Sequence, residues 1–323
     1  MRIDVHAHYF PPEYLALLSR LAGGAAETEH RLPAGRLPLD ERADLLTEVG
    51  IDRQVLSAGQ RQPYLPREAD AVAAARLAND LYADACRAYS DRYAAFAAMP
   101  LPHVDAALRE LERCLDALGM VGVGLGCSVA GRPLDDPAFE PFFAELDRRG
   151  AVISLHPVGA GVLEGEDPYG LAWMVGAPFE DTVAALRLVL SGLTTRYPRL
   201  RVIVPHLGGT IPFLWARIDG FGQSRGIATT IDLTAGLGVH LRRLWYDTVN
   251  TYPDALHCAC GAYGADRLLM GTDFPYLGGP KLRRCVTYIE EADLSAAERD
   301  AILGGNAQAL LGLPARGGAA TPV

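Results

Sequence analysis

RIDVHAH, residues 2–8, is the stretch from which the rest of the chain can be understood. Its apolar character predicts a short β-strand, in which successive side chains point to opposite faces. His6 and His8 are therefore expected on one face, and Val5 and Ala7 on the other. Two neighbouring imidazoles are half of a site for a transition metal, because neutral imidazole is a good ligand for Zn, Fe, Co, Ni or Cu. The pair alone is equally compatible with ordinary surface or core histidines, so the remaining ligands must come from elsewhere in the chain.

The length and composition limit the class of protein. With 323 residues, the chain is about right for one large α/β barrel, although two ordinary domains would also fit. Half of the residues are hydrophobic, so a large core is available. No apolar run reaches the ~18 residues that a membrane span needs, and the N-terminus lacks the basic and then apolar pattern of a signal peptide. We therefore expect a soluble, cytoplasmic protein without a membrane partner.

The charge and the cysteines limit the partners further. The formal net charge is −9 and no basic run offers contacts to phosphates, so nucleic acid is not an expected partner. The six cysteines lie in apolar or helical contexts and are expected to be reduced thiols. Cys258 and Cys260 follow His257, but they fall in a helical pattern, where residues i and i+2 do not share a face. No metal site is expected there.

Strand-like and helix-like stretches alternate along the chain. The expected strands are residues 2–8, 53–58, 94–101, 121–125, 151–156, 201–206, 245–249 and 267–273. Helical patterns lie between them, and a last one from Ser295 to Leu311 opens with a capping box. This alternation implies a parallel sheet covered by helices, and eight such units predict a (β/α)8 TIM barrel. An open doubly wound sheet is the alternative, but no Gly-x-Gly-x-x-Gly motif follows an early strand.

The composition also suggests boundaries. We expect one domain over residues 1–314 and a flexible tail over residues 315–323. Residues 9–37 are rich in Gly, Ala and Pro and have no sustained period, which suggests a small insertion after the first strand. The Gly-rich stretch 157–178, which contains Trp173 and Met174, is expected to be a long active-site loop.

Further candidate ligands end the later strands. His156 ends the fifth strand, His206 the sixth and Asp273 the eighth, in the contexts VISLHP, VIVPHLGG and LMGTDFP. The C-terminal ends of the strands carry the active site of a TIM barrel, so these residues are expected beside His6 and His8. A single histidine at the end of a strand is more often structural. Five such residues at the same end of a barrel indicate a site that binds a metal or moves protons.

Together these motifs resemble those of the amidohydrolase superfamily, from Met1 to about Leu311. The chain is most similar to the branch of 2-amino-3-carboxymuconate-6-semialdehyde decarboxylase and related non-oxidative decarboxylases of small aromatic acids. The resemblance implies one divalent metal ion, most often Zn²⁺, with Mn²⁺, Fe²⁺ or Co²⁺ as alternatives. The implied ligands are His6, His8, His156 and Asp273. It also implies that His206 is the catalytic histidine, and Asp273 is expected to help pass the proton.

The resemblance implies two functional arginines as well. Arg42 matches an arginine that holds the substrate carboxylate, although a solvated helix face is a competing interpretation of its pattern. Arg217 matches an arginine that the family's dimers donate across the interface, so a homodimer is expected. Binuclear members bridge two metals with a lysine from the middle of the barrel, whereas the only lysine here, Lys281, lies beyond the last strand. One metal is therefore favoured. Histidine at both positions of the first motif brings the site nearer to the aminocarboxymuconate semialdehyde enzyme than to members with glutamate at the first.

The expected function is a metal-dependent, non-oxidative decarboxylase of a small aromatic or muconate-type carboxylic acid. Three histidines and one carboxylate leave a divalent metal with an open position, which is typical of a catalytic site. Trp173, Phe274 and Tyr276 are expected to form apolar walls of the pocket, although aromatic residues at such positions also serve in packing. The alternative is a hydrolase, such as a lactonase or amidase, or a hydratase that uses the same activated water. A metal-bound barrel without catalysis is the third interpretation.

Overall fold

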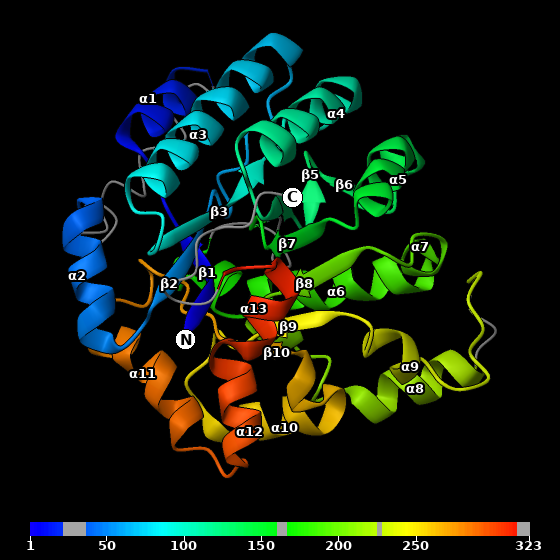
Figure 1. Ribbon diagram of the computed structural model, residues 1–323. Coiled ribbons are helices and arrows are strands. Elements are labelled where there is room, and N and C mark those ends of the chain that lie inside the picture. The colour runs from blue at the N-terminus through cyan, green and yellow to red at the C-terminus, as the bar shows by residue number, and fades with distance from the viewer. Residues whose placement is uncertain (22–36, 160–166, 225–227, 315–323) are drawn as a thin grey trace.

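Eight parallel strands form one sheet whose spatial order follows the order of the chain (Figure 1). The computed structural model describes residues 1–21, 37–159, 167–224 and 228–314. The strands are β1 (Ile3–His8), β2 (Arg53–Ser57), β3 (Tyr93–Ala98), β4 (Gly122–Gly126), β7 (Val152–His156), β8 (Arg201–Val204), β9 (Trp245–Asp247) and β10 (Leu268–Leu269). Each expected strand is present, with bounds that differ by a few residues at most ends.

The first and last strands bring the sheet round into a nearly closed barrel. The amide of Val5 donates to the carbonyl of Met270 at 2.9 Å, and the amide of His8 donates to the carbonyl of Phe274 at 2.7 Å. Ala7 and Phe274 also form a parallel bridge. The predicted TIM barrel is therefore confirmed, and the alternative of an open doubly wound sheet is wrong.

Helices surround the strands, as Figure 1 shows. They are α1 (Pro12–Leu21), α2 (Leu39–Val49), α3 (Glu68–Ala88), α4 (Val104–Glu112), α5 (Glu140–Arg149), α6 (Ala177–Leu190), α7 (Leu193–Arg196), α8 (Trp215–Ser224), α9 (Gly238–Leu241), α10 (Pro253–Tyr263), α11 (Pro280–Glu290), α12 (Ala296–Asp300) and α13 (Asn306–Leu311). The predicted capping box at the start of α12 is confirmed, because Ser295 and Glu298 bond reciprocally. No described helix is both long and apolar enough to cross a membrane.

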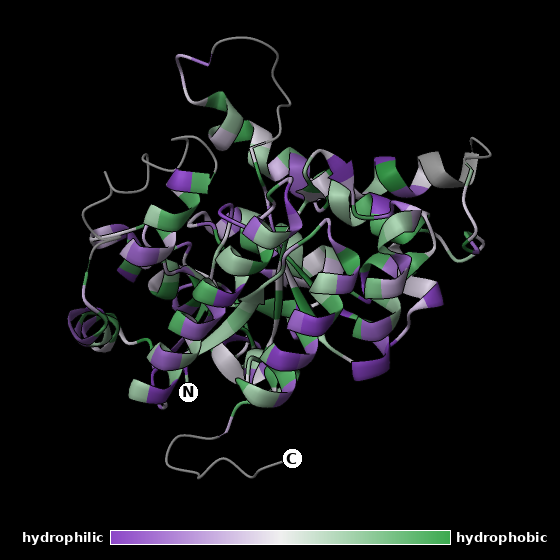
Figure 2. Cartoon of the chain, turned by 90° about the horizontal axis from the view of Figure 1, so that it is seen from above, coloured by the Kyte–Doolittle hydropathy of each residue, from purple (hydrophilic) through white to green (hydrophobic). Residues whose placement is uncertain are grey.

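The core has two parts. A large cluster packs the outer faces of the strands against the helices, and in Figure 2 the central strands are coloured mainly as hydrophobic while the helices mix both colours. A smaller cluster joins residues from most strands with the C-terminal helix, and we call it the lower cluster. Its buried members are Ile3, Val5, Val55, Ala94, Phe96, Val152, Ile203, Leu269, Ala307, Leu310, Leu311 and Leu313. Helix α13 thus closes the end of the barrel at which the strands begin (Figure 1).

Strand β1 contains a bulge that sequence alternation does not reveal. Asp4 pairs with Gln54 and Ala7 with Leu56, so β1 has one residue more than β2 between these pairs. Val5 consequently packs in the lower cluster, whereas Ala7 packs in the large one. The expectation that Val5 and Ala7 share a face was therefore wrong. His6 and His8 nevertheless lie together, with ring centroids 5.1 Å apart.

Two stretches that were expected to be irregular contain helix. Within the expected insertion 9–37, α1 is helical and buries Tyr14, Leu15 and Leu18, while residues 22–36 lie outside the described residues. Within the expected loop 157–178, a π-helical turn at Ala172–Gly176 leads directly into α6. A short antiparallel hairpin of β5 (Ser128–Val129) and β6 (Arg132–Pro133) follows β4 and was not predicted. The expected tail 315–323 also lies outside the described residues.

Candidate active site

Four predicted ligands meet at the end of the barrel where the strands finish. His8 ends β1 and His6 lies two residues before it, His156 ends β7, and Asp273 follows β10. One ligand atom from each of these residues lies within 4.8 Å of the others. Among the described residues, no other group of three or more His, Cys, Asp or Glu side chains is arranged in this way. Three imidazoles and one carboxylate are a donor set that suits a divalent metal with an open position.

The orientation of the three rings fits a metal. Each Nδ1 atom already has a partner, which leaves Nε2 to face the cluster. The partners are Asp247 for His6 at 2.7 Å, Ser57 for His8 at 3.2 Å and the carbonyl of Pro157 for His156 at 2.7 Å. A carbonyl can only accept, so Nδ1 of His156 carries the proton and its Nε2 carries a lone pair. The Nε2 atoms of His6 and His156 are both buried. Nε2 of His6 lies 3.2 Å from Oδ1 of Asp273, whereas Nε2 of His156 has no hydrogen-bond partner among the described residues.

The charges around the cluster also suit a cation. Burial lowers the pKa of His156 well below its ordinary value, and burial lowers the pKa of His8 as well, so both rings are neutral ligands. Burial alone would raise the pKa of Asp273, but hydrogen bonds from His6 and His8 hold it well below its usual range. Although burial favours the neutral ring of His6, the carboxylates of Asp247 and Asp273 raise its pKa well above the ordinary value. Without a cation, the site therefore combines two neutral imidazoles with an ionised carboxylate and a third imidazole that favours its charged form.

His206 lies beside this cluster. It follows β8 with a left-handed backbone (φ 54°), and its ring centroid is 5.3 Å from that of His6 and 6.3 Å from that of His156. Its amide donates to Oδ1 of Asp247 at 2.9 Å. Although burial favours the neutral ring, the neighbouring carboxylate of Asp181 raises the pKa of His206 above its ordinary value. The structure thus brings His206 together with the four candidate ligands.

Arg42 reaches the same end of the barrel from α2. Only 3% of its surface is exposed, so the interpretation as a solvated helix face is wrong. Its Nε donates to Oε1 of Gln54 and its Nη1 to the carbonyl of His8, both at 2.8 Å. Burial lowers its pKa to about 10, which still leaves the guanidinium charged at neutral pH. Nη2 is buried and has no hydrogen-bond partner among the described residues.

The remaining predicted residues lie in different settings. Phe274 is fully buried, and its ring centroid is 4.5 Å below the guanidinium carbon of Arg42. The ring of Tyr276 is 5.6 Å from that of His8. Trp173 is half exposed and packs so closely on Gly159 that an added Cβ there would lie 3.0 Å from Cζ2 of Trp173. Arg217 is exposed on α8, and the structure does not bring it to the histidine cluster within this chain.

Two buried carboxylates at the site were not predicted. Asp247 is the last residue of β9, bonds the ring of His6 and accepts the amide of His206. The expected strand 245–249 placed Asp247 in mid-strand, so the end-of-strand signal that identified His156 did not point to it. Asp181 lies within α6 and contacts the ring of His206 at 2.7 Å. Nothing in the local sequence distinguishes Asp181 from other acidic residues on helices.

The comparisons with known proteins agree with this geometry. A family model described as Amidohydrolase matches residues 3–313. The 2-amino-3-carboxymuconate-6-semialdehyde decarboxylase of Dictyostelium discoideum is 27% identical over 97% of this chain and 92% of its own length. A gamma-resorcylate decarboxylase of Polaromonas sp. is 33% identical over 85% of this chain and 87% of its own. The crystal structure of a dihydroxybenzoic acid decarboxylase from Polaromonas sp., with bound manganese and an inhibitor, matches with TM-score 0.80 and 27% identity over 97% of both chains. The resemblance seen in the motifs is thus confirmed, and the chain belongs to the amidohydrolase family.

Proposed function

We propose that this protein is a metal-dependent, non-oxidative decarboxylase that acts on a small aromatic or muconate-type carboxylic acid. The observation that carries the proposal is the position of three kinds of group at one end of the barrel. They are the cluster of four candidate ligands, the ring of His206 beside it, and the buried Nη2 of Arg42, whose hydrogen-bonding capacity is unused among the described residues. Relatives named as decarboxylases over most of the chain support the same reaction.

His6, His8, His156 and Asp273 would hold the metal. We propose Zn²⁺ first, because three nitrogen donors and one carboxylate are a typical catalytic zinc set, with Mn²⁺, Fe²⁺ or Co²⁺ as alternatives. A similar solved structure holds manganese, so the identity of the ion has to be measured. When bound, such an ion supplies Lewis acidity toward substrate oxygens and lowers the pKa of water.

Arg42 would bind the substrate carboxylate. Its Nε and Nη1 are already used to fix the guanidinium against Gln54 and the carbonyl of His8, which leaves Nη2 as the free donor. A charge-assisted hydrogen bond to a carboxylate is about twice as strong as a neutral one, and a fixed guanidinium loses little further entropy on binding. Phe274 is too deeply buried for the expected direct contact with substrate, and we propose that it supports Arg42 instead.

His206 and Asp273 would move the proton. In the proposed reaction, the carbon that bears the carboxylate takes up a proton and loses its conjugation. The bond from that carbon to the carboxylate carbon then breaks, carbon dioxide leaves, and the electron pair returns to the conjugated system. The substrate anion and one proton therefore become the product and carbon dioxide. Nε2 of His206 is the side of the ring that remains for this transfer, because Nδ1 faces Asp181. Tyr276 and Trp173 are proposed to line the apolar part of the pocket.

We propose that the protein works as a homodimer. Val175, Phe179 and Val183 are spaced by four residues along the π-helical turn and α6, and their exposed fractions are 45%, 39% and 54%. Residues with this spacing share one helix face, and exposed apolar faces commonly mark interfaces. Arg217 is exposed on α8 and is proposed to reach the site of the other subunit. Light scattering of the wild type and of Arg217→Ala tests the dimer. The carbon dioxide release assay described below, applied to both proteins, tests the role of Arg217.

We also propose a cytoplasmic location. The six cysteines are free thiols, and several of them are buried in the core. Unpaired thiols are typical of proteins in a reducing compartment.

The decisive experiment combines metal analysis with a carbon dioxide release assay over a panel of ortho-hydroxy and amino aromatic acids and muconate-type acids. We expect about one metal per chain and release that is lost in His206→Ala, because removing a general acid or base costs ~10²–10⁴-fold in rate. Metal without release from any acid, together with hydrolysis or hydration of a lactone, amide or double bond, would favour the alternative reactions. Absence of metal from protein never exposed to a chelator would contradict the site itself.

A further inference from the structure

One ring nitrogen of His206, Nδ1, is bonded to a buried carboxylate. Nδ1 of His206 lies 2.7 Å from Oδ2 of Asp181, whose side chain is fully buried. The other carboxylate oxygen, Oδ1, accepts the thiol of Cys127 at 3.4 Å. Both oxygens of Asp181 therefore have partners, one of which is the histidine that we propose to move the proton.

The backbone around this pair is held closely in register. The amide of Thr210 donates to Oγ1 of Thr182 at 2.8 Å, and that hydroxyl donates to the carbonyl of Pro178 at 2.8 Å. Gly209 approaches α6 so closely that an added Cβ would lie 2.0 Å from the same carbonyl. The start of α6 and the segment that carries His206 are thus locked together. This contact holds the backbone of Asp181 beside the segment that carries His206.

Burying a carboxylate is costly unless its oxygens are well bonded, so the arrangement calls for a role beyond packing. An ionised carboxylate only accepts hydrogen bonds, and it therefore requires a proton on Nδ1 of His206. We propose that Asp181 is a positioning residue, which fixes the proton of His206 on Nδ1 and aims Nε2 at the reaction site. Cys127 completes the arrangement by holding the second oxygen of Asp181. This inference rests on the proposed role of His206.

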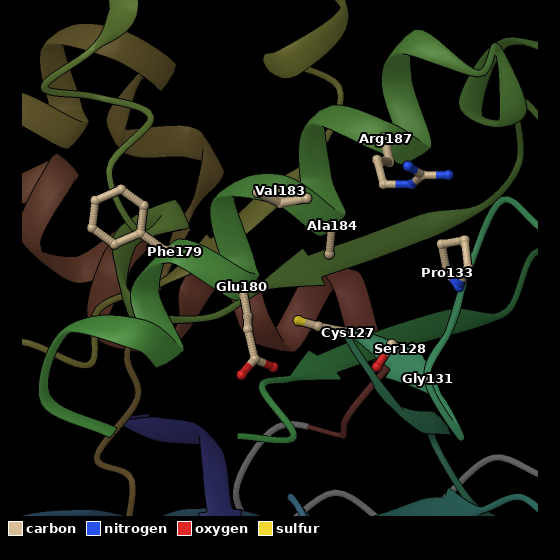
Figure 3. A pocket seen from close by; sticks show the side chains of 9 residues that line it. All are labelled: Cys127, Ser128, Gly131, Pro133, Phe179, Glu180, Val183, Ala184 and Arg187. Atoms are coloured by element: carbon tan, nitrogen blue, oxygen red, sulfur yellow. The ribbon is translucent and has the colours of Figure 1, made fainter. Parts of the chain in front are cut away.

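A pocket of about 370 Å³ lies beside Cys127, between α6 and the β5–β6 hairpin (Figure 3). Cys127 lines this pocket together with Phe179 and Glu180 of α6 and Pro133 of the hairpin. A small change at Cys127 should therefore be accommodated without disturbing the barrel, which makes this residue a usable second position for a test.

The test is nitrogen NMR of the protein with ¹⁵N-labelled histidine, loaded with zinc and again after treatment with a chelator. His206→Gln identifies the signals of His206 by their loss. We expect a proton on Nδ1 of His206 in the wild type. A wild-type ring that carries its proton only on Nε2 overturns the proposal, whether or not any variant folds.

Asp181→Asn provides the second readout. An amide can donate to Nδ1, so we expect the proton to move to Nε2 and kcat for the acid to fall by ~10²-fold or more, with a smaller change in KM. Cys127→Ala should leave the proton on Nδ1 and reduce kcat by less than about tenfold, because it removes only a weak thiol donor. An Asp181→Asn protein that keeps both the Nδ1 proton and the wild-type kcat contradicts the proposal.

The matched control is Asp135→Asn. Asp135 lies outside α6 and pairs with Arg187, which is on the same helix as Asp181. The variant therefore weakens the anchoring of α6 without changing Asp181. It should leave the proton position and kcat unchanged. If no acid is decarboxylated by the wild type, the proposed function fails while the position of the proton still decides the role of Asp181.

Discussion

The two ends of the barrel are built from opposite kinds of side chain. At the end where the strands finish, histidines, carboxylates and Arg42 are buried together. At the end where they begin, the lower cluster is entirely apolar and is sealed by α13. Met1 and Gly304 meet there so closely that a Cβ on Gly304 would lie 1.9 Å from the carbonyl of Met1. The comparison suggests that one end sets the chemistry and the other the stability.

The backbone conformation also distinguishes the polar end of the barrel. His206, Leu207 and Asp273, all at the polar end, have φ between 54° and 57°, a conformation that side chains other than glycine rarely adopt. Such residues cost about 1–3 kcal/mol each, and they persist where the surrounding structure fixes them. Burial of one apolar side chain in the lower cluster contributes about 1.5–3 kcal/mol. Packing at the apolar end can therefore offset strain at the polar end, and this division can be tested by mutation.

The largest effect is expected for His156→Gln. Loss of one ligand should remove most of the metal and lower kcat/KM by about 10³-fold or more, because the Lewis acid and a candidate ligand disappear together. The melting temperature of the metal-free protein should change little. Elemental analysis, the acid assay and calorimetry measure the three quantities. His257→Gln on the outer helix α10 is the control, and it should leave the metal content, kcat/KM and the melting temperature unchanged. A metal-free His156→Gln protein that melts far below the metal-free wild type would show that the polar end also sets the stability, which contradicts the comparison.

The converse result is expected for Leu310→Ala in the lower cluster. Leu310 is 3% exposed, and truncating a buried leucine to alanine costs about 2–5 kcal/mol of unfolding free energy. Metal content and kcat of the folded fraction should stay at the wild-type level. Urea unfolding followed by far-UV circular dichroism gives the free energy. If kcat falls while the protein remains folded, the two ends are coupled more strongly than the comparison implies.

The same contrast explains what could be predicted from the sequence. The strands and their terminal histidines follow from apolar runs that end in an unusual residue type, and the amidohydrolase motifs fix their spacing. The bulge in β1 was missed because it depends on how β1 pairs with β2, which local alternation does not encode. Asp181 was missed for a similar reason. Its role arises only when α6 is packed against the segment that carries His206.

Arg42→Lys should have a smaller effect than the first two variants. Lysine keeps the charge but loses the fixed guanidinium, so KM for the acid should rise by about 10–100-fold, which corresponds to the 1.5–3 kcal/mol of a charged hydrogen bond. The change in kcat should be smaller. Steady-state kinetics separate the two constants. Arg92→Lys is the matched control, because Arg92 also donates to backbone carbonyls but does so beside the lower end of β3. An unchanged KM would show that Arg42 does not bind the substrate carboxylate.

The smallest effects are expected at the partners of the ligands, and they should be graded. Asp247 bonds Nδ1 of His6 at 2.7 Å and also accepts the amide of His206, whereas Ser57 lies 3.2 Å from Nδ1 of His8. Substitution of a residue that orients a metal ligand typically lowers the metal affinity by about 10–100-fold. Asp247→Asn should therefore weaken zinc binding within that range, and Ser57→Ala by less than about tenfold, because a long neutral contact orients its ring weakly. Competition with a zinc chelator measures both affinities. Equal losses in the two variants would mean that the charge of Asp247 does not contribute to holding the metal, and that the polar end depends on ring orientation alone.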